Sequence, residues 1–106
     1  MIRAAFFVTQ DDRLLGFHIK GHSGYDESGK DIICAFVSSA AYLSANTITD
    51  VIGIRAEVFD QDGEMFLRVD KKDADPCQTI LKGLRLHLLG TEEQYPQYLK
   101  VTFTEV

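Results

Sequence analysis

Hydrophobic and polar positions along the chain change their period several times, and each change predicts a new element. Residues 2–9 carry apolar side chains at both parities, which is typical of a strand near the centre of a sheet. After a polar break at residues 10–12, residues 15–20 alternate strictly, with His18 on the more polar face. The two runs predict neighbouring strands joined by a short turn.

A helical period begins after Asp31. Apolar and small side chains recur every three or four positions, which predicts a largely buried helix over about residues 32–50 that ends at Gly53. Asp31 stands where an N-cap residue is expected, and Cys34 falls in the first turn of the helix. The predicted inward positions are Ile33, Phe36, Val37, Ala40, Ser44, Thr47 and Ile48.

The second half of the chain repeats the sequence of two strands and a helix. Strands are expected at residues 54–60 and 64–70, joined by the turn dipeptide Asp62-Gly63. A helix should start with Asp75 as its cap and Pro76 at its first position, and should reach about Glu93. Its apolar stripe consists of Cys77, Ile80, Leu81, Leu84 and Leu88.

A final strand is expected over residues 98–106, with Leu99, Val101 and Phe103 on one face. The order strand, strand, helix, strand, strand, helix, strand predicts an α+β fold. Two helices should pack as one layer on a mainly antiparallel five-stranded sheet. Residues 1–106 contain no linker and no repeat, so a single domain is expected.

Composition and charge narrow the class of protein. The chain has 106 residues, 45% of them hydrophobic, and a formal net charge of −5, which argues against direct binding of nucleic acid and is compatible with a basic partner. No segment resembles a membrane span, and Met1 leads directly into a strand, so neither membrane insertion nor a signal peptide is expected. The two cysteines then favour a cytoplasmic protein with reduced thiols.

Cys34 is the strongest candidate for chemistry. Unpaired amides at a helix start favour a thiolate and are suited to hold a developing oxyanion beside it. The alternative is that Cys34 is a small buried hydrophobe. Cys77 also lies at a predicted helix start, but it falls on the core stripe and has no neighbouring histidine, so it is interpreted as core.

His22 is the best candidate base for that thiol. It follows a strand, twelve residues before Cys34, and a glycine-containing loop between them allows the two to meet. His18 is a possible substitute but lies within the strand, and His87 is expected to be exposed on the second helix. The alternatives for His22 are a surface or loop-capping histidine.

Two further residues are placed to support this pair. Asp31 is favoured as the helix cap that positions Cys34, with orientation of His22 as the other reading. Ser38 lies one helical turn after Cys34, where it either contacts the thiol or allows close helix packing. A metal held by His18, His22, Cys34 and a loop carboxylate lacks a repeated ligand spacing, and no nucleotide-binding glycine motif occurs. No metal and no cofactor are expected.

The stretches Gly21-His22-Ser23-Gly24-Tyr25 and Gly29-Lys30-Asp31-Ile32-Ile33-Cys34-Ala35, with Ser38 behind, resemble the signature of the ribosomal-processing cysteine proteases, the Prp family. The specific part covers about eighteen residues, and chain length and element order fit as well. Phe36 departs from the pattern, since the family usually has a small residue there.

The resemblance implies a Cys-His dyad endopeptidase, with Cys34 as nucleophile and His22 as general base and acid. Its substrate would be the N-terminal extension of the twenty-seventh protein of the large ribosomal subunit. It also implies a homodimer. The off-stripe residues Leu86 and Leu89 are either ordinary surface leucines or a patch that meets the partner subunit. The competing interpretations are a thiol-dependent redox enzyme and a non-enzymatic module that binds ribosomal or other proteins. A mobile active-site loop is expected to contain Ser23, Gly24, Tyr25 and Gly29.

Overall fold

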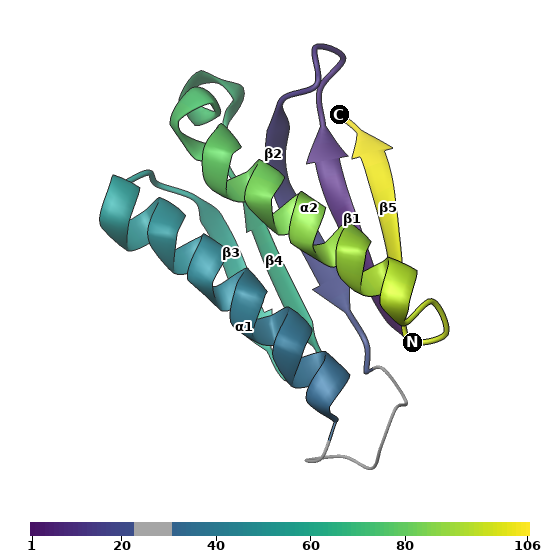
Figure 1. Ribbon diagram of the computed structural model, residues 1–106. Coiled ribbons are helices and arrows are strands. Elements are labelled where there is room, and N and C mark those ends of the chain that lie inside the picture. The colour runs from purple at the N-terminus through teal and green to yellow at the C-terminus, as the bar shows by residue number, and fades with distance from the viewer. Residues whose placement is uncertain (23–30) are drawn as a thin grey trace.

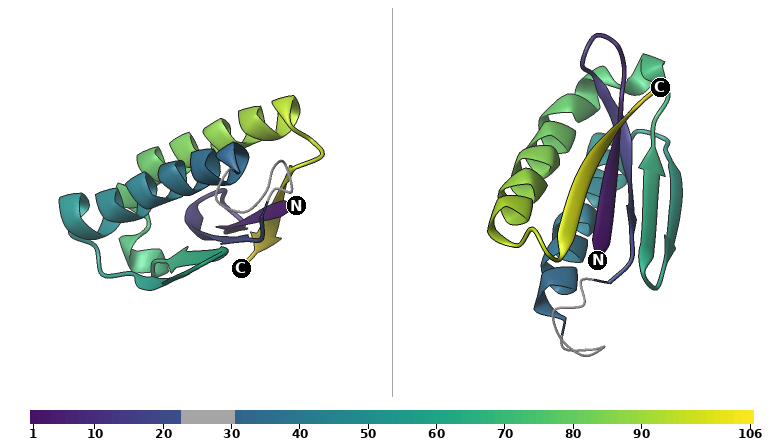
Figure 2. Two further views of the ribbon diagram at one scale, coloured as in Figure 1. Left: turned by 90° about the horizontal axis from the view of Figure 1, so that it is seen from below. Right: turned by 90° about the vertical axis from the view of Figure 1, so that its right-hand side faces the viewer.

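In the computed structural model, which describes residues 1–22 and 31–106, two helices cover one face of a five-stranded sheet (Figure 1). Figure 2 shows the sheet from its edge, with both helices on the same side. The predicted α+β architecture and element order are confirmed. The strands are β1 (Ile2–Val8), β2 (Leu14–Lys20), β3 (Glu57–Gln61), β4 (Glu64–Arg68) and β5 (Leu99–Glu105), and the helices are α1 (Ile32–Asn46) and α2 (Gln78–Gln94).

The strand order is β3-β4-β2-β1-β5, so β2 lies at the centre of the sheet. Three pairings are antiparallel and the β1–β5 pairing is parallel. Lys20, the last residue of β2, lies opposite Glu64 at the start of β4. The chain that leaves β2 therefore passes the turn between β3 and β4, and this register places His22 beside that turn.

Helix α1 starts as the capping pattern predicts. The carboxylate of Asp31 accepts a hydrogen bond from the backbone amide of Cys34 at 2.9 Å. The helix continues as a wider turn, Thr47–Ile52, and ends at Gly53, whose φ of +83° suits a residue without a side chain. Its buried positions in these two segments are Ile33, Val37, Ala41, Ser44, Ala45 and Ile48.

The prediction that Phe36 faces the core is wrong. Its side chain is 49% exposed, and its ring stacks on the ring of His87 with centroids 4.8 Å apart. Phe36 and His87 thus meet on the layer of the two helices instead of between α1 and the sheet. The helical period alone placed Phe36 at the margin of the apolar stripe, where a neighbouring helix offers it a partner.

The predicted start of α2 is also corrected. Asp75–Cys77 forms a separate 3-10 turn, and α2 begins only at Gln78. Asp75 forms an ion pair with Arg13 at 3.1 Å instead of capping the helix. The predicted apolar stripe is confirmed at its main positions, which are buried. Leu86 and Leu89, which lie off the stripe, are exposed as expected. The buried residues of the 3-10 turn and α2 are Cys77, Leu81, Leu84, Leu88 and Thr91.

A side chain that the sequence analysis did not select joins α2 to the central strand. The amide group of Gln78 accepts a hydrogen bond from the backbone N–H of Leu14 and donates one to the carbonyl of the same residue, both at 2.8 Å. It therefore satisfies the backbone groups where β2 begins, much as a neighbouring strand would. This fixes β2, and with it the segment that carries His22.

One stretch, Ile32–Ile52, is long and apolar enough by length and composition to cross a membrane, so the expectation that no segment resembles a span is wrong by that criterion. Core helices of soluble proteins often pass the same test. Here Ile33, Val37 and Ile48 belong to the core cluster formed with the sheet, which accounts for part of the apolar composition.

Candidate active site

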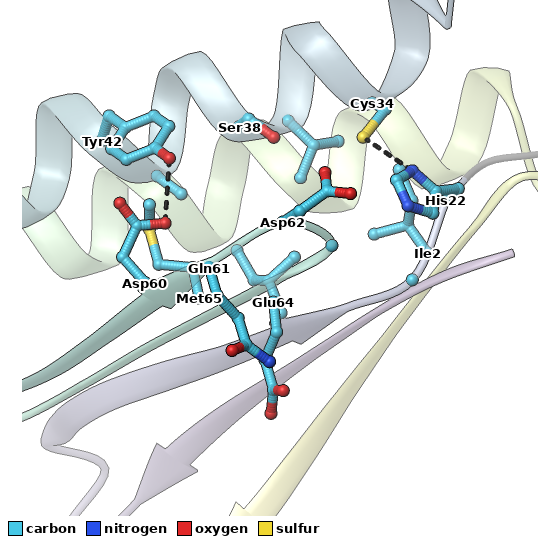
Figure 3. A pocket seen from close by; sticks show the side chains of 15 residues that line it. Ile2, His22, Cys34, Ser38, Tyr42, Asp60, Gln61, Asp62, Glu64 and Met65 are labelled. Atoms are coloured by element: carbon cyan, nitrogen blue, oxygen red, sulfur yellow. Dashed lines mark hydrogen bonds between the residues drawn. The ribbon is translucent and has the colours of Figure 1, made fainter. Parts of the chain in front are cut away.

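A cavity of about 320 Å³ opens between the start of α1, the end of β2 and the turn that joins β3 to β4 (Figure 3). Cys34 and His22 lie at one end of it, and Ser38 lies further along the same face of α1. The structure thus brings three of the residues selected from the sequence into one cavity.

Cys34 and His22 face each other. The thiol sulfur of Cys34 lies 3.9 Å from Nδ1 of His22, at the long end of a sulfur hydrogen bond (Figure 3). His22 is exposed and Cys34 is partly exposed, so a substrate has access to both. A base at this distance from a thiol is the arrangement that nucleophilic catalysis by cysteine requires.

His18 does not take part in this arrangement. Its ring pairs with the carboxylate of Glu64 at 2.6 Å and contacts the edge of Phe66. His18 lies opposite Phe66 in the pairing of β2 with β4, and Glu64 lies diagonally from it, two residues before Phe66 and opposite Lys20. Side chains at this parity point to the sheet face away from the helices. The carboxylate of Glu64 has a lowered pKa, chiefly because His18 hydrogen-bonds to it.

The turn between β3 and β4 supports the histidine. The backbone amide of Gly21 donates a hydrogen bond to the carbonyl of Gly63 at 2.8 Å, which fixes the chain next to His22. Gly63 has a φ of +76°, and a Cβ atom built on it would lie only 3.1 Å from Nε2 of His22. Gly63 therefore serves both the tight turn and the close approach of the imidazole.

Asp31 lies next to the pair as well as capping the helix. Its carboxylate oxygen, Nδ1 or Nε2 of His22, and the sulfur of Cys34 all lie within 4.8 Å of one another. Both predicted roles, the cap and the orientation of His22, are compatible with this position. A carboxylate, an imidazole and a thiol are also a donor set that suits Zn²⁺. The group differs from the set considered in the sequence, because His18 is not part of it and Asp31 supplies the carboxylate.

The position of Cys34 at a helix start was expected to favour a thiolate, but its surroundings favour the protonated thiol. Burial raises the pKa of the Cys34 thiol above its usual value of about 9, and the negative charges of Asp31 and Asp62 raise it further. A hydrogen bond from Ser38 acts in the opposite direction. The balance favours the neutral thiol in the free protein.

Two of the amides nearest the sulfur are already engaged. The amide of Cys34 donates to the carboxylate of Asp31, and that of Ala35 donates to the carbonyl of Asp31 at 3.1 Å. Neither of these two amides is free to bind an oxyanion at the helix start, where the sequence predicted one would be held.

Cys77 is confirmed as a core residue. It has no exposed surface, and its thiol donates a hydrogen bond to the carbonyl of Asp73 at 3.5 Å. Burial raises the pKa of this thiol, and the charge of Asp73 adds to the effect. Cys77 does not line the cavity and is not disulfide-bonded to Cys34.

Comparison with protein families decides the class. The family model described as cysteine protease Prp matches residues 1–100. The chain belongs to this family. The ribosomal processing cysteine protease Prp of Bacillus subtilis is 27% identical to this chain over 108 aligned positions. The alignment covers 96% of this chain and 96% of that protein. The protein of the same name from Staphylococcus aureus is 27% identical over 105 residues, which span 97% of this chain and 99% of that one.

Solved structures agree with the Prp assignment. The crystal structure of an essential ribosomal processing protease Prp from S. aureus, with a covalently linked product peptide, matches with a TM-score of 0.89 and 25% identity. The match covers 98% of this chain and 100% of that chain. A second structure of the S. aureus protease, with a substrate peptide, supports the fold with a TM-score of 0.83 and 24% identity. The protein is a cysteine protease of the Prp family, as the resemblance implied.

Several lining residues of this Prp-family cavity were not selected from the sequence. Tyr42 lies one helical turn beyond Ser38, so the spacing that selected Ser38 also contained the signal for Tyr42. Its hydroxyl donates a hydrogen bond to Asp60 on β3 at 2.9 Å, which raises the pKa of Tyr42. Asp60, Asp62 and Gly63 come from the hairpin of β3 and β4, and only the strand register brings them to the cavity.

Ser23, Gly24, Tyr25 and Gly29 lie outside the described residues, so the expected mobile loop stays a prediction.

Proposed function

We propose that this Prp-family protease removes the N-terminal extension of the twenty-seventh protein of the large ribosomal subunit, with Cys34 as nucleophile and His22 as general base and acid. The observation that carries the assignment of the dyad is the 3.9 Å separation of the Cys34 sulfur and Nδ1 of His22 inside an open cavity. The relatives named ribosomal processing cysteine proteases support a role in ribosomal processing, and the choice of the twenty-seventh protein rests on the family resemblance.

The reaction begins with transfer of the Cys34 proton to Nδ1 of His22. The sulfur attacks the peptide carbonyl carbon, and the oxygen of the tetrahedral intermediate accepts hydrogen bonds from first-turn amides of α1. His22 then gives its proton to the departing amine, and the carbon–nitrogen bond breaks. In the second half, His22 takes a proton from water and the hydroxide attacks the thioester carbon. The carbon–sulfur bond then breaks, the acid product leaves, and His22 returns its proton to the sulfur of Cys34.

Asp31 and Ser38 act on the dyad without forming bonds to substrate. Asp31 holds the amide of Cys34 and fixes the start of α1, and its carboxylate lies close enough to orient His22. Ser38 hydrogen-bonds to the thiol and favours its deprotonation against burial and the neighbouring carboxylates. Both are positioning residues in this mechanism.

The test is incubation of the protein with the ribosomal protein that carries its extension. A single cut is expected, read by mass spectrometry of the products. Cys34→Ala and His22→Ala should abolish it, whereas Cys77→Ala should still cut at a temperature where its circular dichroism spectrum shows it folded. Cleavage by Cys34→Ala would refute the assignment of the nucleophile.

We extend the proposal to a homodimer in the cytoplasm. Leu86 and Leu89 on α2 are 74% and 37% exposed, and they form a candidate apolar patch for a second copy. The unpaired Cys34 and Cys77 fit a reducing compartment. Light scattering after size exclusion should give twice the chain mass for the wild type. It should give the monomer mass for Leu86→Glu, and a monomeric wild type would contradict this part.

A further inference from the structure

The walls of the active-site cavity carry a one-sided charge. Among the described residues that line it are three carboxylates, Asp60, Asp62 and Glu64, and neither lysine nor arginine. A cleft lined by one sign of charge concentrates the field and favours ligands of the opposite sign. A fourth carboxylate, that of Asp31, lies beside Cys34 but accepts the hydrogen bond of the Cys34 amide.

Two of the three already have partners within the protein. Asp60 accepts the hydrogen bond of Tyr42, and Glu64 pairs with His18 on the other face of the sheet. In Figure 3 the Glu64 side chain runs away from Cys34. Neither carboxylate is placed to receive a charge from a peptide bound at the sulfur.

Asp62 differs in both respects. It is the exposed residue at the tip of the β3–β4 turn, and its carboxylate points toward α1 between Ser38 and Cys34 (Figure 3). Within residues 1–22 and 31–106, no ion pair or hydrogen bond to this carboxylate is found. Asp62 therefore presents its charge to the cavity.

We propose that Asp62 determines specificity by binding a lysine or arginine side chain of the peptide substrate close to the scissile bond. The inference rests on the proposed function in one respect, since it takes Cys34 as the atom at which the bond is cut. The neighbouring Gly63 packs against His22. The turn between β3 and β4 would therefore position the base and bind the substrate side chain.

A cation at this position also assists the chemistry. The negative charge of Asp62 contributes to the raised pKa of the Cys34 thiol, and a bound lysine or arginine offsets that charge. A substrate with lysine or arginine at this position then makes the Cys34 thiol easier to deprotonate. The preference for a basic residue should therefore appear in kcat as well as in KM.

The charge can be measured at Cys34 without any substrate. Two methanethiosulfonate reagents, one with an aminoethyl and one with a sulfonatoethyl group, differ mainly in charge. In each case the thiolate attacks the reagent's sulfenyl sulfur, a mixed disulfide forms and methanesulfinate leaves. The ratio of the cationic to the anionic rate constant reports the local field, because a change in the thiol pKa alters both rates equally.

Asp62→Asn should lower this ratio about threefold, and Asp62→Lys should lower it about tenfold at low salt, as expected for one and two units of charge at an exposed site. Asp50→Lys is the matched control, because it makes the same charge change at an exposed position in the turn Thr47–Ile52, which follows the end of α1 opposite to Cys34. Its ratio should stay within about 1.5-fold of wild type. An Asp62→Lys ratio that equals the Asp50→Lys ratio would overturn the proposal.

A second measurement uses labelled ten-residue peptides that span the cleavage junction, each with lysine, norleucine or glutamate at one position. Their binding to Cys34→Ala is read by fluorescence anisotropy, so it does not depend on cleavage. At one position at least, the Cys34→Ala protein with Asp62 intact should bind the lysine peptide about fivefold more tightly than the glutamate peptide. Adding Asp62→Lys to the same protein should reverse this order. If peptides are cut but show no preference that depends on Asp62, this inference fails while the proposed function stands.

Discussion

The imidazole of His22 rests against Gly63, so closely that a Cβ atom on residue 63 would be 3.1 Å from Nε2. These residues are far apart in sequence, and pairing of β2 with β4 brings them together. Nδ1 on the other side of the ring faces the sulfur of Cys34. The imidazole is therefore held between a glycine turn that leaves little room for a side chain and the thiol of Cys34.

The first prediction concerns Gly63→Ala. The substitution should lower the free energy of unfolding by about 1–2 kcal/mol, because alanine is strained at a φ of +76°. It should also lower kcat/KM by roughly tenfold or more, because the new methyl group displaces the base. Urea denaturation and peptide cleavage, measured on the same preparation, separate the two effects.

Gly83→Ala is the matched control for Gly63→Ala. No atom lies within 4 Å of a Cβ built at Gly83, which is inside α2, so alanine should stabilise the helix by about 0.5–1 kcal/mol and leave cleavage unchanged. Wild-type kcat/KM in Gly63→Ala would show that the contact does not position His22.

Features that depend on residues close together in the sequence could be predicted, and features that depend on strand pairing could not. The cap at Asp31 and the position of Cys34 depend on residues within one turn, so the sequence pattern was sufficient for both. The same rule failed at Asp75, because Arg13 from the first hairpin competes for its carboxylate. His22 could be preferred to His18 because His18 lies within a strand, but the positions of Gly63 and Asp60 at the site depend on strand register, which no local pattern specifies.

The second prediction concerns the pH dependence of Cys34 reactivity. Burial, Asp31 and Asp62 raise the thiol pKa and Ser38 lowers it, so less thiolate is present at pH 7 than in a free thiol. The rate of alkylation by iodoacetamide should rise with pH and have its midpoint above 9. Ser38→Ala should move the midpoint higher and slow the reaction at pH 7, and Asp62→Asn should do the reverse.

Ser39→Ala is the control for this profile, because Ser39 is exposed and does not line the cavity. Mass spectrometry should find the label on Cys34 and leave the fully buried Cys77 unmodified. An unchanged midpoint in Ser38→Ala would remove the assigned role of that hydroxyl.

The third prediction concerns acid stability and the pair of His18 and Glu64. The folded-state pKa of Glu64 lies below its usual value of 4.5, chiefly through the hydrogen bond from His18. A carboxyl with a depressed pKa contributes stability above its unfolded pKa, and that contribution is lost as the pH falls through the folded pKa. Glu64→Gln should therefore flatten the loss of stability below about pH 4.5, measured by urea denaturation. Glu93→Gln, on the exposed side of α2, should keep the wild-type slope.

The last prediction concerns Phe36, which stands where the family pattern has a small residue. Its ring stacks on His87 at 4.8 Å and 27°, so it joins the active-site end of α1 to α2. A double-mutant cycle of Phe36→Ala and His87→Ala should give a coupling free energy of about 0.5–1.5 kcal/mol in urea denaturation. The cycle with Leu86→Ala, a residue 74% exposed on the same helix, should be additive within about 0.5 kcal/mol. Additivity in both cycles would mean that the stack does not hold the helices together, and that Phe36 replaces the small residue without compensation.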